Sequence, residues 1–171
     1  MQKEWTNEER RQWLEAAMEK YEESLLRLCF AYLKDRALAE YAAQETFLKA
    51  FRGLSKYRGD SDEKTWLTRI AMNTCRDIRR SAWFRHVDRG AGLDSLPEPS
   101  IPFTPRDDTL VRSIMGLARR HREVILLHYY QDLTVQEIAS VLGLSRSAVY
   151  NRLEKAQSIL KSELKEWYED E

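Results

Sequence analysis

All four prolines of this 171-residue chain fall between positions 97 and 105, and this clustering restricts the fold more than any other feature. A proline inside a helix removes a backbone hydrogen bond and clashes with the preceding turn. The long segments on either side contain no proline, and the whole chain has only six glycines, so few turns are expected. The pattern predicts two small helical domains, at residues 1–89 and 108–171, joined by a proline-rich linker at residues 90–107.

Apolar residues recur every three or four positions on both sides of the linker, which is the period of one helix face. No segment alternates strictly between apolar and polar residues as a half-buried strand does, so the expected fold class is all-α. On the third helix, Trp66, Leu67 and Ile70 are assigned to the core. The predicted helices span residues 9–34, 37–52 and 62–82 before the linker, and residues near 108–117 and 120–131 after it.

Composition argues against a membrane or secreted protein. No apolar run approaches the roughly 20 residues that a membrane helix needs, so we expect no membrane insertion. The N-terminal residues are charged and do not look like a secretory signal. Two cysteines, Cys29 and Cys75, are too few for a disulfide scaffold and are expected to be small buried residues. These features predict a cytoplasmic protein.

An enzyme is the competing functional class. The titratable candidates are the two cysteines with His86, His121 and His128, and they show neither metal-ligand spacing nor a CxxC or HExxH motif. The chain also lacks a glycine-rich phosphate loop. We therefore expect no catalytic site, no metal and no cofactor.

Charge is unevenly distributed although the formal net charge is +0. Residues 49–89 carry a net charge of +6 and residues 111–165 a net charge of +4, and an acidic segment with a net charge of −3 separates them. Two basic blocks are typical of two separate contacts with a polyanion. Charge alone leaves open the alternative that solvated helix surfaces differ in charge by chance.

The sharpest local signal is a helix-turn-helix between positions 132 and 160. Thr134 and Glu137 form a capping-box pattern at the start of the first helix. Gly143 suits a left-handed turn residue, and Ser145 is a candidate N-cap for the second helix. In this motif the second helix enters the DNA major groove.

The predicted outward face of that second helix is polar. Hydroxyl, amide and cationic side chains of this kind can hydrogen-bond base edges and phosphates, whereas an ordinary amphipathic hairpin with a solvated face is the alternative. Arg146 and Arg152 are placed nearer the buried edge. The residues expected to contact DNA are Arg146, Ser147, Tyr150, Asn151, Arg152 and Lys155.

Two blocks resemble bacterial extracytoplasmic-function sigma factors. The stretch AQETFLKAFRGLSKYRGDSDEKTWLTRIAMNTCRDIRR is similar to their region 2, and residues 110–165 resemble their region 4. The resemblance implies that region 2 binds core RNA polymerase and opens the −10 promoter element, while region 4 reads the −35 element. It also implies an anti-sigma factor as a further partner.

The resemblance assigns roles to individual residues. Gln44, Glu45, Phe47 and Leu48 match the segment that docks on polymerase, and Tyr41 stands where the family usually has an acidic residue. Asn73 matches the asparagine that helps to hold a base flipped from the −10 strand. The other residues assigned to −10 DNA are Lys56, Tyr57 and Arg58 in the loop, and Arg69, Arg76, Arg79 and Arg80 on the following helix.

A stand-alone helix-turn-helix regulator with a helical sensor domain is the alternative. Residues 44–80 discriminate between the two, because a sensor domain has no need of the region 2 motifs. A regulator would bind duplex DNA alone, whereas a sigma factor would associate with RNA polymerase.

Overall fold

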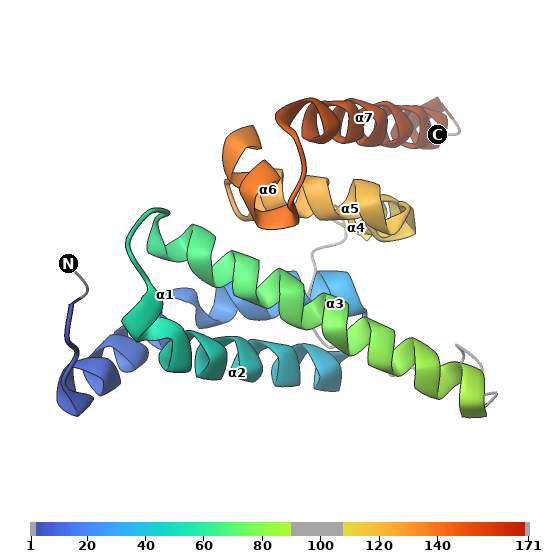
Figure 1. Cartoon of the computed structure of the whole chain (residues 1–171). Helices are drawn as coiled ribbons and strands as arrows, with labels where there is room; N and C mark the ends of the chain where they lie inside the picture. Colours follow the sequence, from blue (N-terminus) through green and yellow to red (C-terminus); the bar gives the residue numbers. More distant parts are fainter. Residues whose placement is uncertain (1–2, 90–107, 170–171) are drawn as a thin grey trace. The chain divides into compact units, whose positions relative to one another are not determined.

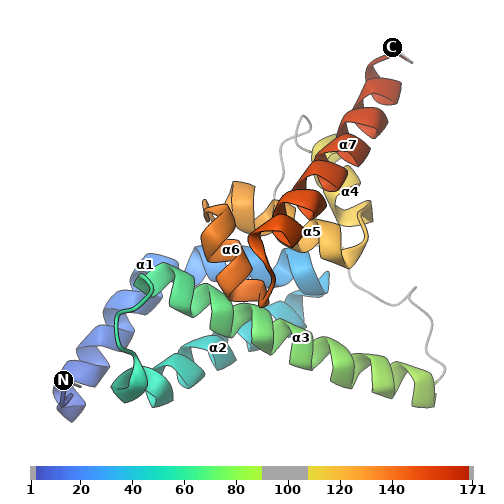
Figure 2. The same cartoon turned by 45° about the horizontal axis from the view of Figure 1, so that its top comes forward.

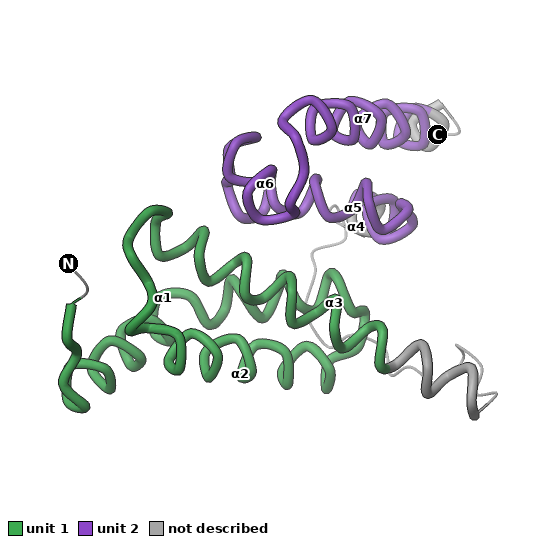
Figure 3. Tube along the Cα trace, viewed as in Figure 1, with its two compact units in different colours: residues 1–99 green, residues 100–171 purple. Residues whose placement is uncertain are grey.

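The chain divides into two compact units, Met1–Pro99 and Ser100–Glu171 (Figure 3). This computed structural model describes residues 3–89 and 108–169. The secondary structure of these two ranges is helical and contains no strand, which confirms the all-α prediction. The predicted linker at 90–107 lies outside the described residues.

Over residues 3–89, unit 1 is built from three long helices and one short helical turn. These are α1 (Asn7–Leu33), α2 (Arg36–Gly53), the 3-10 turn η1 (Leu54–Lys56) and α3 (Glu63–Arg89) (Figure 1). Each of the three long helices packs against the other two, so one apolar core lies between them. Its fully buried members include Leu25, Leu28, Tyr32, Ala39, Ala42, Phe47, Leu54, Leu67 and Met72.

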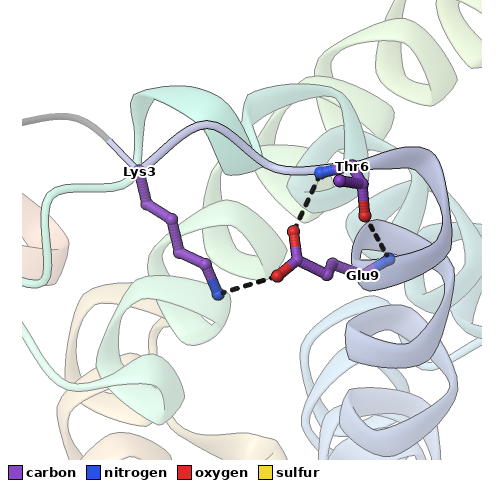
Figure 4. A network of polar contacts seen from close by, with 3 residues as sticks. All are labelled: Lys3, Thr6 and Glu9. Atoms are coloured by element: carbon purple, nitrogen blue, oxygen red, sulfur yellow. Dashed lines mark hydrogen bonds and ion pairs between the residues drawn. The ribbon is translucent and has the colours of Figure 1, made fainter.

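A capping box fixes the start of α1 (Figure 4). The Glu9 amide donates to Thr6 Oγ1 at 3.2 Å, and the Thr6 amide donates to Glu9 Oε2 at 2.9 Å. Lys3 Nζ lies 3.8 Å from the other Glu9 oxygen. These contacts satisfy amides that have no partner within the helix, so α1 begins two residues before the predicted position 9.

The connection from α2 to α3 brings distant residues together at one end of unit 1. The helix α2 runs one residue beyond the predicted end at position 52, to Gly53, which has φ −89° and is not left-handed, and the chain continues directly into η1. Figure 2 shows this connection at the same end of the unit as the N-terminal half of α1. Asp62 then starts α3 by accepting a hydrogen bond of 2.7 Å from the Thr65 amide.

The two cysteines lie in the core of unit 1. Cys29 on α1 and Cys75 on α3 are both fully buried free thiols, as expected from the sequence. A hydrogen bond with Cys29, together with burial, raises the pKa of the Cys75 thiol above its ordinary value. The Cys75 thiol is therefore protonated at neutral pH, and both cysteines act as packing groups in the core.

Within residues 108–169, unit 2 contains four helices and one π-helical turn. They are α4 (Asp108–Gly116), α5 (Arg119–Ile125), the turn η3 (Leu126–Tyr130), α6 (Val135–Leu142) and α7 (Arg146–Glu169). The predicted single helix at 120–131 is thus partly wrong, because its second half widens into a π turn. The core of unit 2 includes Val124, Ile125, Leu127, Ile138, Val149, Leu153 and Ala156.

The local signals of the helix-turn-helix are confirmed. The Glu137 amide donates to Thr134 Oγ1 at 3.2 Å, and the Thr134 amide donates to Glu137 Oε2 at 2.8 Å. Gly143 ends α6 in the left-handed region, with φ 67° and ψ 36°. Ser145 accepts a hydrogen bond of 3.1 Å from the Ala148 amide at the start of α7.

A buried arginine stabilises the turn between α4 and α5. Arg122 on α5 is buried, and its guanidinium donates to the Met115 carbonyl at 3.2 Å and to the Leu117 carbonyl at 3.4 Å. The carbonyls at the end of α4 lack intrahelical partners, so the cation satisfies them where water is excluded. Arg122 thereby fixes the turn between α4 and α5.

Candidate nucleic-acid and polymerase interfaces

A hollow of about 340 Å³ opens on the surface of unit 1. Lys56, Tyr57 and Asn73, which the resemblance assigns to −10 DNA, lie together around it, whereas Arg58 is exposed on the same loop and is not part of the lining. The full lining comes from the end of α2, from η1 and the loop after it, and from the middle of α3: Lys49, Gly53, Lys56, Tyr57, Trp66, Ile70 and Asn73.

Stacked aromatic rings form one side of this hollow. The rings of Tyr57 and Trp66 lie nearly parallel, with centroids 4.4 Å apart and an interplanar angle of 21°. The Tyr57 hydroxyl donates to the Ser61 carbonyl at 2.5 Å, which holds the ring against the loop. Burial, with the nearby Glu63 and Asp62 carboxylates, raises the pKa of Tyr57, so the hydroxyl stays neutral and keeps this bond.

Lys49 places a positive charge beside the same hollow. Its Nζ donates to Thr74 Oγ1 at 3.0 Å, which ties the end of α2 to α3. The Thr74 hydroxyl in turn donates to the Ile70 carbonyl at 2.8 Å. One of the three ammonium donors is thus used within unit 1, and the other two are available to a group bound in the hollow.

Four residues that line the hollow are not among the DNA-contacting residues predicted from the sequence: Lys49, Gly53, Trp66 and Ile70. The prediction that Trp66 and Ile70 belong to the core is wrong for the surface they share, because both are half-buried and line the hollow. Leu67 is fully buried, as predicted. Their spacing of four and three residues from Trp66 to Ile70 to Asn73 places them on one helix face, which was a usable signal. Lys49 and Gly53 carry no comparable signal, because only the packing of α2 against α3 brings them there.

The basic residues of α3 do not all share one face. Counting by 100° per residue, Arg69, Arg76 and Arg80 lie within about 60° of Asn73, whereas Arg79 points about 120° away. Arg80 is exposed, and Arg69 and Arg76 are half-buried. The face with Asn73 therefore presents a row of cations that continues from the hollow along the helix.

The predicted polymerase-docking segment separates into buried and exposed side chains. Phe47 is only 3% exposed and belongs to the core, so its side chain offers no surface to a partner; its place in the docking set is corrected. Leu48 is 43% exposed, Gln44 is exposed and Glu45 is half-buried. Tyr41, 54% exposed, lies on the same face of α2 and extends this surface.

The second helix of the helix-turn-helix presents the predicted polar face. Val149, Leu153, Ala156 and Leu160 are buried, as expected, so the residues opposite them face solvent. Ser147, Tyr150, Asn151 and Lys155 are exposed. Arg146, at the first position of α7, is exposed as well, and Arg152 is half-buried at the edge.

A buried histidine lies behind this face. His121 on α5 is 7% exposed. Burial lowers its pKa below the ordinary value of 6.5, and the positive charges of Arg120, Arg152 and Lys155 lower it further. The imidazole is therefore neutral in the folded chain at neutral pH.

This histidine makes stability dependent on pH. Below about pH 6.5 the unfolded chain binds a proton at His121 more readily than the folded chain, so stability falls as pH falls. Between about pH 7.5 and about pH 5.5, we expect the thermal midpoint of the wild type to fall a few degrees more than that of His121→Leu. Circular dichroism melts measure this, with His128→Gln as the control. Equal changes in the wild type and His121→Leu would contradict the prediction.

Both units match models of known protein families. The model of sigma-70 region 2 matches residues 17–85, and the model of sigma-70 region 4 matches residues 107–157. The chain is 31% identical to the RNA polymerase sigma factor YlaC of Bacillus subtilis, over 92% of this chain and 95% of that protein. It is 34% identical to the ECF RNA polymerase sigma factor SigL of Mycobacterium tuberculosis, over 77% of each. The chain belongs to the ECF group of sigma-70 factors.

Solved structures agree with this family at the level of the fold. The sigma factor RpoE of Bartonella quintana, solved with the anti-sigma factor NepR, has a TM-score of 0.77 and 20% identity, over 88% of this chain and 96% of that one. As a sigma factor, the protein binds core RNA polymerase and directs promoter-specific initiation. The match over residues 17–85 disfavours the stand-alone regulator.

Two further findings concern the described residues of this sigma factor. None of its helices there is both long and apolar enough to cross a membrane. In the same part of the chain, no group of three or more His, Cys, Asp or Glu side chains is placed to hold a metal ion.

Proposed function

We propose that this sigma factor opens promoter DNA by holding one unpaired base of the −10 non-template strand in the hollow of unit 1. The observation that carries this proposal is that Lys56, Tyr57 and Asn73 line one hollow beside the stacked Tyr57–Trp66 pair. A base taken out of the stack needs an aromatic surface, edge hydrogen bonds and nearby cations. The rings, the Asn73 amide and Lys49 with Lys56 supply these three.

The cations along α3 extend this interface. Arg69, Arg76 and Arg80 share the face of Asn73, so they are suited to follow the phosphates of the same strand. Arg58 on the exposed loop and Arg79, which points to the side, are suited to more distant phosphates. These contacts are sequence-independent and fix the position of the strand.

The exposed face of α2 is the proposed polymerase contact. Leu48 and Tyr41 provide apolar area, and Gln44 and Glu45 provide hydrogen bonds on the same face. Exposed apolar groups surrounded by polar ones are typical of protein interfaces. Polymerase then holds unit 1 so that the hollow can meet the −10 strand.

Unit 2 is the proposed −35 reader. Ser147 and Asn151 project outward from α7 and are suited to base edges, while Arg146, Arg152 and Lys155 are suited to phosphates. Tyr150, which is 60% exposed, adds apolar contact. We divide the chain accordingly into a region 2 domain at 1–89, a linker at 90–107 and a region 4 domain at 108–171.

The remaining parts of the proposal concern chemistry, location and regulation. Polymerase supplies the catalysis, and this chain has no catalytic site or cofactor of its own. It acts in the cytoplasm with the polymerase. Similar solved structures hold a sigma factor with NepR and the protein CnrH with the cytosolic domain of CnrY, and we propose that an anti-sigma factor binds this chain too.

Run-off transcription with core polymerase and randomised promoter DNA tests the function. The wild type should select promoters with defined −35 and −10 elements.

The double variant Gln44→Ala, Glu45→Ala should weaken polymerase binding about tenfold or more, because it removes polar contacts at the proposed interface. Its circular dichroism spectrum should match the wild type, since neither side chain is fully buried. Normal polymerase affinity of this variant would reject the α2 interface.

Base and phosphate contacts of α7 can be separated. Asn151→Ala should change the preferred −35 sequence, because losing a base contact costs about 1–3 kcal/mol at the matching base pair. Lys155→Ala should lower output from all promoters alike and reduce the salt slope by about one. Randomised-promoter transcription measures both. An unchanged −35 preference in Asn151→Ala would show that α7 is turned differently in the groove.

A further inference from the structure

We propose that the first turns of α1 hold the hollow of unit 1 in the geometry that binds the −10 strand. Trp13 packs against Trp66, and Arg10 bonds to the end of α2. This inference rests on the proposed function of the hollow and adds two residues that do not line it. Both would act through other residues, so they are positioning residues for strand opening. They lie outside the region 2 match, which begins at residue 17.

Trp13 contacts the Trp66 ring, which stacks on Tyr57 at one side of the hollow. Its centroid lies 6.0 Å from that of Trp66, at an interplanar angle of 57°. Trp66 therefore lies between Trp13 on one side and Tyr57, at 4.4 Å, on another. An indole with aromatic neighbours on two sides loses alternative rotamers, so the Trp13 contact holds Trp66 in its stacking position.

Arg10 fixes the backbone that leads into the hollow. Its guanidinium donates to the Phe51 carbonyl at 2.9 Å and lies 4.5 Å from the centroid of the Phe51 ring. Phe51 is two residues before Gly53, and the same carbonyl accepts from the Leu54 amide where η1 starts. A cation at the end of a helix also interacts favourably with its dipole. The loop that carries Lys56 and Tyr57 thus leaves α2 from an anchored point.

The capping box makes this part of α1 a rigid support. Thr6, Glu9 and Lys3 close the first turn (Figure 4), immediately before Arg10 and one turn before Trp13. The first fully buried residue of α1 is Ala17, which comes after both. The early turns therefore add little to the core, and Arg10 and Trp13 instead contact Phe51 and Trp66.

Misplacing a stacking surface weakens the contact that it makes, even when every lining residue is present. An aromatic pair stabilises its geometry enough that losing it should weaken base binding about 2- to 10-fold. Trp13→Leu should therefore bind a single-stranded −10 element more weakly and discriminate less between bases at the flipped position. Trp13→Phe should restore both, because it keeps a ring against Trp66. Arg10→Gln should show a similar loss, since it removes the cation from Phe51.

The test uses the full chain assembled with core polymerase and fork DNA whose −10 non-template strand is single-stranded, from a promoter selected with the wild type. Binding is measured with each base substituted in turn at each −10 position. Trp5→Leu is the matched control, because Trp5 is a half-buried tryptophan that lies against Lys3 and does not line the hollow. It should behave as the wild type does. Polymerase affinity and binding of −35 duplex are measured beside it.

Four outcomes are decisive. A loss in Trp13→Leu confined to the −10 strand, with rescue by Trp13→Phe, supports the inference. Wild-type binding by Trp13→Leu, with weakened binding by Asn73→Ala, overturns it and leaves the proposed function standing. Wild-type binding by both variants rejects the hollow as a base site, and the inference with it. Equal losses of −10, −35 and polymerase binding in Trp13→Leu would show general destabilisation and also overturn the inference. Should Trp13→Leu not fold, Arg10→Gln decides by the same criteria.

Discussion

Phe47→Ala is expected to lower the free energy of unfolding of the chain by about 3–5 kcal/mol, the largest stability effect that we expect from a single substitution in α2. Phe47 lies in the core between the three long helices, where its side chain is 3% exposed. Truncation leaves a cavity that the packed helices cannot fill completely. Urea unfolding followed by circular dichroism measures the change.

Leu48→Ala is the matched control, because it is the neighbouring residue of similar character but is 43% exposed. Its free energy of unfolding should change by less than about 1 kcal/mol, while its affinity for core polymerase should fall. The opposite result, a stable Phe47→Ala with weakened polymerase binding, would place Phe47 on the interface and contradict the core assignment. The pair therefore separates packing from docking within one turn of α2.

Asn73→Ala is expected to reduce open-complex formation about 5- to 150-fold, the largest functional effect of a single substitution. The estimate follows from about 1–3 kcal/mol for the loss of a good base contact. Asn73 is exposed and lines the hollow, so its amide can reach a base edge while its loss leaves the core intact. Permanganate reactivity of the promoter thymines reports the opening.

The matched control replaces the other amide assigned to DNA. Asn151→Ala should leave strand opening unchanged on a promoter with a compensating −35 sequence, because Asn151 belongs to α7 in unit 2. Binding of −35 duplex should persist in Asn73→Ala. Wild-type permanganate reactivity in Asn73→Ala would show that this amide does not hold a base.

The helix-turn-helix could be predicted closely because its signals are local. Thr134 and Glu137 satisfy each other's amides across three residues, and Gly143 adopts the left-handed conformation that its lack of a Cβ allows. The apolar period then places Val149 and Leu153 inside, which leaves Asn151 outside. The start of α1 also depends on a local signal, the capping box of Thr6 and Glu9, whereas the apolar period alone predicts a start two residues later.

The π turn shows where local signals are insufficient. Residues 126–130 continue the apolar pattern of α5, so periodicity predicts an unbroken helix. Instead the Gln131 amide bonds to the Leu126 carbonyl at 3.1 Å, and the Leu133 amide bonds to the Leu127 carbonyl at 3.0 Å. Packing of α5 and η3 against their neighbours in unit 2 selects these wider bonds.

The sequence by itself determined the helical class, the two motif blocks and the caps of the helix-turn-helix, and the family resemblance predicted a −10 DNA role for Lys56, Tyr57 and Asn73. Those features depend on residues within a few positions of one another or on the order of motifs. Only the tertiary structure decided that Phe47 is buried while Leu48 is exposed, because both continue the same apolar stripe. It also placed Lys49, Trp66 and Trp13 around or behind one hollow. These three residues come from three helices, and only side-chain packing, which has no sequence period, brings them together.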